Sequence, residues 1–219
     1  MKLFQSLIRC RYRITSGFRQ RRFDFFWNAL GKHVCGKEAG TQWWLDLGGG
    51  PGSYLLAQLE TRARAMPRVI LLDRGEAELR DAQARFPHAQ LVCADGERLP
   101  FAAGAFDLVF CNSVIEHVAH PDALAAEICR TGRHFFVQTP NEKFPLESHS
   151  HMPLPFFRAL PRTLQWWMAR GAGASWDYLM SVRYLTEAEL RALFPDARIL
   201  RERAFGLTKS FYVLSTEDM

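Results

Sequence analysis

A glycine-rich turn restricts the folds open to this chain more than any other segment. It spans residues 46–52 and reads Asp-Leu-Gly-Gly-Gly-Pro-Gly, directly after an apolar run and directly before a helical pattern. Glycines are needed where a chain turns sharply with positive φ, or where the backbone must approach a ligand without intervening side chains. A strand, a glycine turn and a helix in this order are typical of α/β proteins that bind a ligand at the turn.

Short apolar runs alternate with helical patterns from residue 43 to residue 138. The runs cover 43–47, 69–73, 91–93, 106–111 and 134–138, and the helical patterns cover 54–59, 76–86 and 122–130. Strands that alternate with helices of this length form right-handed βαβ units, whose parallel sheet is covered on both faces. Ligands bind outside the carboxyl ends of such strands.

The last third of the chain departs from this alternation. Residues 140–180 contain five prolines and seven aromatic residues, and the stretch is too long for an ordinary connection. We therefore predict an insertion there that covers the ligand site. Thr186 and Glu189 have the spacing of a capping box and begin a predicted helix, and two further strands are predicted over 197–203 and 210–215.

Composition excludes several classes of protein. The 219 residues are 48% hydrophobic and 23% charged, as in soluble globular proteins, and no apolar run reaches the roughly 20 residues of a membrane-spanning helix. The five cysteines form neither a Cys-x-x-Cys pair nor a zinc-spaced cluster with histidine. We therefore expect reduced thiols, a cytoplasmic location and no metal site.

The net charge of +5 belongs to the N-terminal segment. Residues 1–22 hold seven basic and no acidic residues, whereas the remainder holds 21 basic and 23 acidic residues. A globally basic nucleic-acid-binding surface is therefore not expected. The segment is interpreted either as a helix that packs over the domain with solvated arginines, or as a basic amphipathic helix on an anionic membrane or nucleic acid. An organellar transit peptide also fits the composition. We expect an N-terminal arm over 1–40 and the main domain over 41–219.

The glycine turn fits one pattern and fails two others. The dinucleotide fingerprint Gly-x-Gly-x-x-Gly fails because its last position falls on Ser53 or Leu55, and the phosphate-binding Gly-x-x-x-x-Gly-Lys pattern is absent. The pattern that fits is Asp-x-Gly-x-Gly-x-Gly, on Asp46, Gly48, Gly50 and Gly52. With aspartates after the next two predicted strands and a polar segment after the fourth, residues 43–138 resemble the class I S-adenosylmethionine-dependent methyltransferases of the small-molecule, type 11 kind.

The resemblance implies a fold and a cofactor site. The fold is α/β and Rossmann-like, a seven-stranded and mostly parallel sheet with helices on both faces and an antiparallel C-terminal strand. The Asp73 carboxylate would accept hydrogen bonds from both ribose hydroxyls, which suits a group that only accepts. Asp95 would receive the adenine amino group, and Gly96 would let the base approach. The implied residues for S-adenosyl-L-methionine are Asp46, Gly48, Gly49, Gly50, Gly52, Asp73, Arg74, Asp95, Gly96, Asn112 and Ser113.

Methyl transfer from a sulfonium requires an aligned acceptor and, for a hydroxyl or amine, removal of a proton. Histidine suits that removal because its pKa lies near neutrality. The candidates are His117 after the fourth strand and Glu147, His149 and His151 in the insertion. His117 has the alternative role of bracing the cofactor loop. The other three form a base, a weak metal site or loop-packing polar groups, and we favour a base because further metal ligands have no obvious source.

Motifs for several acceptors are missing. No Asn/Asp-Pro-Pro-Tyr/Phe follows the fourth strand, which disfavours adenine and amide nitrogen, and no Pro-Cys pair is present for cytosine. The aromatic insertion suits a flat or apolar acceptor, so quinone-like, glycan, lipid-linked and secondary-metabolite acceptors stay open.

We expect methyl transfer to a small molecule, at oxygen first, with nitrogen or carbon open. The protein would be a monomer or weak dimer that can contact a membrane surface through residues 1–22. One alternative is a catalytically silent cofactor-binding relative that acts through a protein partner. Another is an RNA or protein methyltransferase that docks through its basic arm.

Overall fold

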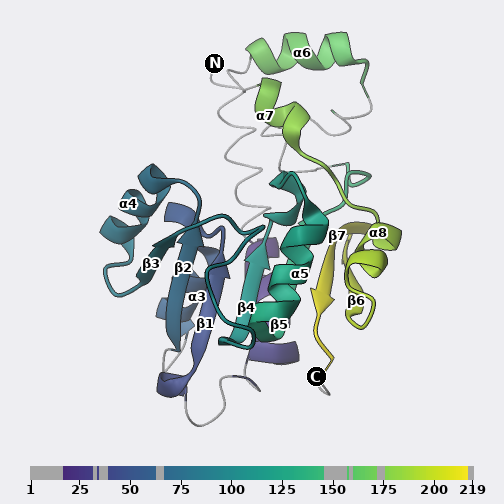
Figure 1. Ribbon diagram of the computed structural model, residues 1–219. Coiled ribbons are helices and arrows are strands. Elements are labelled where there is room, and N and C mark those ends of the chain that lie inside the picture. Colours follow the sequence, from purple (N-terminus) through teal and green to yellow (C-terminus); the bar gives the residue numbers. More distant parts are fainter. Residues whose placement is uncertain are drawn as a thin grey trace.

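The structure is a computed structural model that describes residues 17–31, 34, 39–62, 67–145, 157, 160–171 and 176–216. Among these residues, seven strands form one sheet in the order β3-β2-β1-β4-β5-β7-β6 (Figure 1). The strands are β1 Trp43–Leu47, β2 Arg68–Asp73, β3 Gln90–Cys93, β4 Phe106–Asn112, β5 Gly132–Pro140, β6 Arg198–Ala204 and β7 Leu207–Leu214. Strands β1 to β5 pair in parallel, and β7 is antiparallel to both β5 and β6. The predicted fold class is confirmed.

The helices lie mainly between these strands. The described part of the chain contains α3 Tyr54–Arg62, α4 Glu76–Arg85, α5 Pro121–Thr131, α6 Arg162–Gly171, α7 Trp176–Ser181 and α8 Glu187–Leu193. It also contains the shorter turns η1 Trp27–Gly31, η2 Ala39–Thr41, η3 Gly50–Gly52 and η4 Ile115–His117. A further helix covers residues 17–26 and continues into η1.

Alternate residues of each strand face two different cores. Trp44 of β1 packs with α3, α4 and the helix over 17–26, whereas the next residue, Leu45, packs with α5 and α8 on the opposite face. Strand β4 follows the same rule, because Phe110 belongs to the first core and Val109 to the second. Side chains of a strand point alternately to its two faces, so a strand covered on both sides is apolar throughout.

The helix over 17–26 forms part of the first core. Phe23, Phe26 and Leu30 are almost completely buried, and their spacing of three and four residues sets them on one helix face. Phe26 packs edge-on against Phe110 and lies next to Phe136, with ring centroids 4.9 and 5.2 Å apart. The division into an arm over 1–40 and a domain over 41–219 stays a prediction.

The predicted elements differ from the structure mainly at their ends. Strand β7 begins at Leu207, three residues before the predicted start, because Leu207 and the polar Thr208 pair with Ala204 and Arg203 of β6. The predicted capping box is confirmed, since Thr186 Oγ1 accepts from the Glu189 amide while the Glu189 carboxylate accepts from the Thr186 amide. The insertion, for which no helix was predicted, contains α6 and α7.

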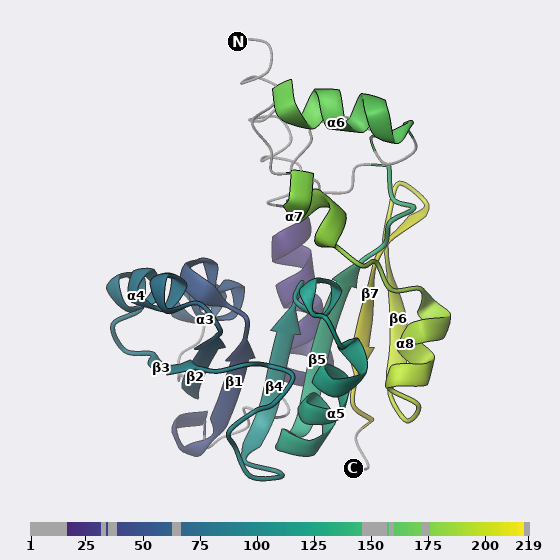
Figure 2. The same ribbon diagram turned by 45° about the horizontal axis from the view of Figure 1, so that its top comes forward.

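Helices α6 and α7 lie beyond the carboxyl ends of β4 and β5 (Figure 2). This is the end of the sheet at which the glycine loop follows β1. No described helix is long and apolar enough to cross a membrane.

Candidate active site

The glycine loop after β1 is held against the ends of its two neighbouring strands. Gly48 and Gly50 have φ of +71° and +48°, a region that favours glycine. The Gly48 amide donates to the Leu72 carbonyl at 2.7 Å, near the end of β2. A Cβ on Gly48 would lie 2.6 Å from Val114 Cγ2, and one on Gly50 would lie 3.3 Å from Asp73 Oδ2. The loop backbone therefore directly contacts the segments after β2 and β4. At Gly48 there is no room for a side chain.

The side chain of Asp46, in β1, packs against this loop. Its carboxylate is buried and accepts a hydrogen bond from the Ser53 hydroxyl, which in turn accepts from the Leu56 amide of α3 at 3.1 Å. A Cβ on Gly49 would lie only 2.5 Å from Asp46 Oδ2. Burial raises the pKa of Asp46 to about 7. The hydrogen bond from Ser53 acts to lower this pKa, and the charge of Asp73 makes a smaller contribution that raises it. Direct contact of Asp46 with the cofactor stays a prediction.

Asp73 ends β2 beside the glycine loop. Its Oδ1 accepts from the Gly75 amide at 3.1 Å, and its carbonyl accepts from the Ala94 amide of the next strand's loop at 3.1 Å. The other carboxylate oxygen is the one nearest to Gly50. Asp73 is only partly buried, so this acceptor remains open to a donor from outside the loop. Arg74, which we also predicted as a cofactor residue, is exposed.

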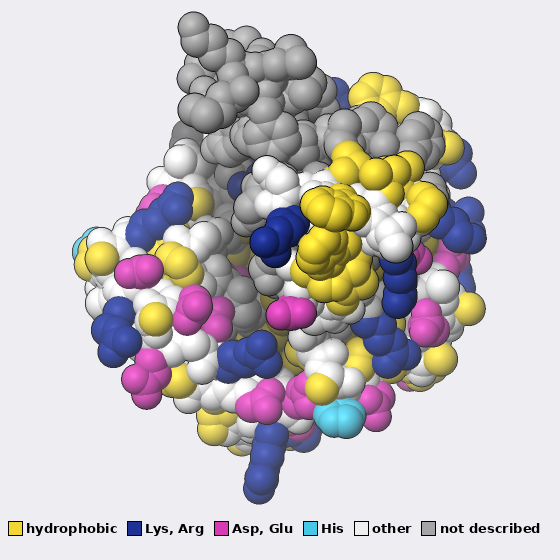
Figure 3. Space-filling view, turned by 90° about the horizontal axis from the view of Figure 1, so that it is seen from above, with side chains coloured by type: hydrophobic (Ala, Val, Ile, Leu, Met, Phe, Trp, Pro, Cys, Tyr) yellow, Lys and Arg dark blue, Asp and Glu magenta, His cyan; other side chains and the backbone are white. Residues whose placement is uncertain are grey.

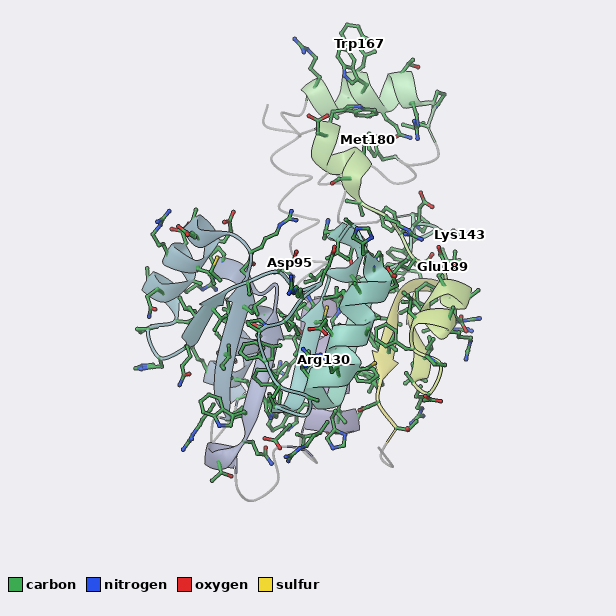
Figure 4. All side chains as sticks on the ribbon, viewed as in Figure 1. Asp95, Arg130, Lys143, Trp167, Met180 and Glu189 are labelled. Atoms are coloured by element: carbon green, nitrogen blue, oxygen red, sulfur yellow. The ribbon has the colours of Figure 1, made fainter. Side chains whose placement is uncertain are left out.

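The loop after β3 carries Asp95, exposed at the same end of the sheet (Figure 4). Asp95 Oδ1 accepts from the Glu97 amide at 2.9 Å. The Glu97 carboxylate accepts from the amides of Ala119 and His120, at 2.8 and 3.0 Å, and so ties this loop to the one after β4. A Cβ on Gly96 would lie 3.1 Å from Leu124 Cδ1, which explains the glycine by packing against α5.

A second pair of side chains fixes the far end of the Asp95 loop. Glu127 of α5 accepts from the Leu99 amide at 2.7 Å and pairs with Arg130 at 2.7 Å. Arg130 donates to the carbonyls of Phe101 and Leu99, and the side chain is labelled in Figure 4. The hydrogen bonds from Arg130 are the first cause that lowers the pKa of Glu127. The predictions from the sequence did not include these residues.

Asn112 and Ser113, at the end of β4, are bound by residues of other elements. Ser113 has a φ of +61°, and its amide and hydroxyl donate to the carbonyl and the side-chain oxygen of Gln138, at 2.8 and 2.7 Å. Arg22 Nη1 donates to Asn112 Oδ1 at 3.0 Å and to Gln138 Oε1 at 2.9 Å. Sequence reasoning missed Arg22 because it counted this residue among solvated arginines. The helical spacing of Phe23, Phe26 and Leu30 could have revealed the buried side of this helix.

Two cations and one carboxylate form a buried cluster next to these amides. Glu202 of β6 lies 3.5 Å from Arg22 and 3.0 Å from Lys209, and the Ser210 hydroxyl donates to it. Burial acts to raise the pKa of Glu202, but the charges of Arg22 and Lys209 outweigh it and lower that pKa. Burial, with the charge of Arg22, lowers the pKa of Lys209 to about 8 against the effect of Glu202. This cluster connects the helix over 17–26 to β6 and β7.

His117, a candidate base, lies in the turn η4 after β4. Its amide donates to the Val114 carbonyl at 2.8 Å, and its side chain is half-buried. The preceding Glu116 is fully buried, accepts from the Thr139 hydroxyl at 3.1 Å, and offers its carbonyl to the Arg183 amide at 2.8 Å. These contacts fix the loop after β4 to β5 and to the segment that follows α7.

The other candidate bases, Glu147, His149 and His151, lie outside the described residues. Within the described ranges, no group of three or more histidine, cysteine, aspartate or glutamate side chains could hold a metal ion.

The described residues fit a nucleoside cofactor with an amino-acid tail. The glycine loop, the Asp73 carboxylate and the Asp95 loop follow three adjacent strands, β1, β2 and β3. Gly50 has no side chain, and the carboxylate of the partly buried Asp73 lies beside its backbone. Gly52 ends η3 with open space where its side chain would lie.

Comparisons with known proteins point to methyltransferases. A family model described as "Methyltransferase domain" matches residues 45–134. An uncharacterized methyltransferase of Mycobacterium avium (strain 104) is 33% identical over 134 residues, which are 55% of this chain and 52% of that protein. A malonyl-[acyl-carrier protein] O-methyltransferase of Legionella pneumophila is 42% identical over 76 residues, 32% of this chain and 25% of that protein.

Among solved structures, the magnesium protoporphyrin IX methyltransferase of Synechocystis PCC 6803 with bound SAM has the same fold, with a TM-score of 0.56. It is 14% identical, and the match covers 93% of this chain and 82% of that one. Residues 45–134 are therefore similar to a methyltransferase domain, and the sheet shares the fold of S-adenosylmethionine-dependent methyltransferases. The chain matches about half the length of the Mycobacterium relative and a quarter of the Legionella relative.

Proposed function

We propose that the protein transfers a methyl group from S-adenosyl-L-methionine to a small-molecule acceptor. The observation that carries the proposal is the position of Asp73 Oδ2, 3.3 Å from where a Gly50 side chain would begin. The cofactor supplies an electrophilic sulfonium methyl group. In this proposal the glycine loop binds the methionine part, Asp73 accepts from both ribose hydroxyls, and Asp95 receives the adenine amino group.

Oxygen is the proposed acceptor atom, with nitrogen or carbon as the alternatives. The Legionella relative is named an O-methyltransferase, which supports oxygen. An oxygen acceptor needs a group that removes its proton, and His117, Glu147, His149 and His151 are the proposed candidates. The bound acceptor would lie at the carboxyl ends of β4 and β5, where the loop after β4 is fixed by Glu116 and Gln138.

The ribose assignment is tested by Asp73→Ala. The variant loses the hydrogen bonds of an ionised acceptor, which contribute about 1.5–3 kcal/mol, so S-adenosylmethionine and S-adenosylhomocysteine should bind about ten to a hundred times more weakly. Calorimetric titration measures this, with NAD as the control ligand. The matched variant is Asp81→Ala, an exposed carboxylate on α4, which should bind like the parent.

Two results would contradict these assignments. Equal affinity of Asp73→Ala and the parent would mean that the ribose lies elsewhere. A parent protein that binds neither S-adenosyl compound would contradict the proposed function itself. Binding without transfer of labelled methyl to any acceptor in a broad screen would favour the silent relative.

The second alternative, an RNA or protein methyltransferase that docks through its basic arm, predicts steep salt dependence of acceptor binding. Its test must keep Arg22, because this residue bonds Asn112 and Gln138 in the structure. A deletion that stops before residue 17 therefore separates docking from damage to the site. Peripheral membrane contact through residues 1–22 also stays a proposal, and most of that segment lies outside the described residues.

A further inference from the structure

The large hydrophobic side chains that are exposed among the described residues gather at one end of the molecule. Three lie on α6 and two follow β6, namely Leu164, Trp166, Trp167, Phe205 and Leu207. Strand β7 is antiparallel to β5 and pairs Ser210 with Pro140, so the β6–β7 turn lies at the carboxyl end of β5. Both segments therefore occupy the end of the sheet that carries the candidate site.

Helix α6 presents tryptophan at its outermost position. Gln165 and Ala169 are buried and face the protein, and Ala169 packs with Phe157. At 100° per residue, Trp167 points almost opposite to these two positions. Its side chain is 67% exposed, and Figure 4 shows it pointing away from the sheet.

The residues that flank Trp167 are apolar on one side and cationic on the other. Leu164 is 45% exposed, while Arg170 holds its guanidinium carbon 5.5 Å from the ring centroid of Trp166. Seen from above, hydrophobic side chains gather on this face beside Lys and Arg side chains (Figure 3). Tryptophan and arginine together are typical of helices that lie in the interface of a bilayer.

The charge of the surrounding chain has one sign. From residue 148 to residue 176 the sequence contains no aspartate or glutamate but three arginines, at positions 158, 162 and 170. The rest of the chain after residue 22 holds 18 basic and 23 acidic residues, so this acid-free stretch is a local departure. Such a stretch is complementary to an anionic surface, because it holds positive charges and no carboxylate that the surface would repel.

We propose that the outer face of α6 docks on an anionic lipid surface. Trp167 and Leu164 enter the interface while Arg170 pairs with acidic headgroups. A ten-residue helix lies in the interface rather than spanning it. Docking in this way turns the carboxyl end of the sheet toward the bilayer. The proposal does not depend on methyl transfer.

The test is flotation of the full chain with vesicles of phosphatidylcholine, and with vesicles of phosphatidylcholine and phosphatidylglycerol in a two-to-one ratio. The parent should bind the anionic vesicles more strongly. Trp167→Ser should lower the partition coefficient about tenfold, the loss expected when one large apolar side chain no longer enters the apolar phase. Trp167→Phe should retain most of the binding, because it keeps an aromatic side chain at the interface.

Charge is tested by a second pair of variants. Arg170→Gln should weaken binding to the anionic vesicles only. Arg133→Gln, an exposed arginine at the start of β5 and hence at the opposite end of the sheet, should leave binding unchanged. Titration with S-adenosylhomocysteine verifies that each variant keeps the affinity of the parent and is folded.

Three outcomes would overturn the proposal. One is a parent that floats with neither vesicle, and another is Trp167→Ser binding as well as the parent. The third is a parent dimer that Trp167→Ser converts to a monomer in analytical ultracentrifugation, since the face would then bind a second copy. A parent that fails to bind S-adenosylhomocysteine yet floats with anionic vesicles would contradict the proposed function and support the docking surface.

Discussion

At the scale of single residues, the candidate site depends on where a side chain is absent. Gly48 adopts positive φ and faces Val114 at a distance that no Cβ can occupy. Gly49 covers the carboxylate of Asp46 just as closely. These glycines are therefore required by packing within the protein as well as by any ligand, because the loop is pressed between a buried acid and the segment after β4.

Asp46 should make stability depend on pH near neutrality. Its pKa is raised to about 7 by burial, so the folded state holds a proton that the unfolded state releases above about pH 4. Its contribution to stability is complete below the unfolded pKa and is lost as the pH rises through about 7.

The variant Asp46→Asn keeps the shape and removes the titration. Its melting temperature relative to the parent should rise between pH 4 and about 7 and then level off, which thermal unfolding across that range measures. Asp81→Asn is the control for a carboxylate-to-amide change at the surface. A difference between Asp46→Asn and the parent that stays constant with pH would show that the buried carboxylate does not titrate there.

At the scale of elements, the helix over 17–26 is attached to the sheet by charge as well as by aromatic packing. Arg22 bonds to β4, β5 and β6 through Asn112, Gln138 and Glu202. The neighbouring Arg21 is exposed. Two adjacent arginines of the same basic segment therefore have different roles, which depend only on the helix face that each occupies.

Arg22→Met should destabilise the protein by about 1–3 kcal/mol, because the side-chain oxygens of Asn112 and Gln138 lose a buried charged donor. Urea unfolding measures the change in the free energy of unfolding. Arg21→Met, one residue away, should change it by less than about 0.5 kcal/mol. Equal effects of the two substitutions would contradict the docking of this helix through Arg22.

At the scale of the whole molecule, the sheet is stable only if both of its faces are covered. The helix over 17–26 covers an aromatic surface formed by Trp44, Phe110, Phe136 and Tyr212. An exposed apolar surface of this kind binds partners or aggregates. The helix over 17–26 and Leu30 of η1 are therefore part of the core rather than an addition to it.

Removal of residues 1–31 should expose that surface. We expect the shortened chain to lose cooperative thermal unfolding, to bind the dye ANS and to aggregate on size-exclusion chromatography. A shortened chain that melts as sharply as the full one would mean that α3 and α4 cover this face unaided.

Local chemistry made much of the protein predictable from its sequence. The apolar runs, the Thr186 capping box and the glycine turn depend on residues that are close along the chain, so the parallel strands and the candidate cofactor loop follow from them. Asp73 and Asp95 then lie at one edge of the sheet, because adjacent parallel strands have their carboxyl ends on the same side. Boundaries were less predictable where strand pairing includes a polar residue such as Thr208.

Only the tertiary structure decided the contacts between distant segments. Gln138 and Arg22 are 116 residues apart. The spacing of the neighbouring phenylalanines can indicate which side of the helix is buried, but no local pattern could show that Arg22 meets β5. Burial of a charge depends on which elements meet, because its energy is set by the partners and solvent around it rather than by its neighbours in sequence. The same reason applies to the outward position of Trp167, which became visible only when Gln165 and Ala169 were found to face the protein.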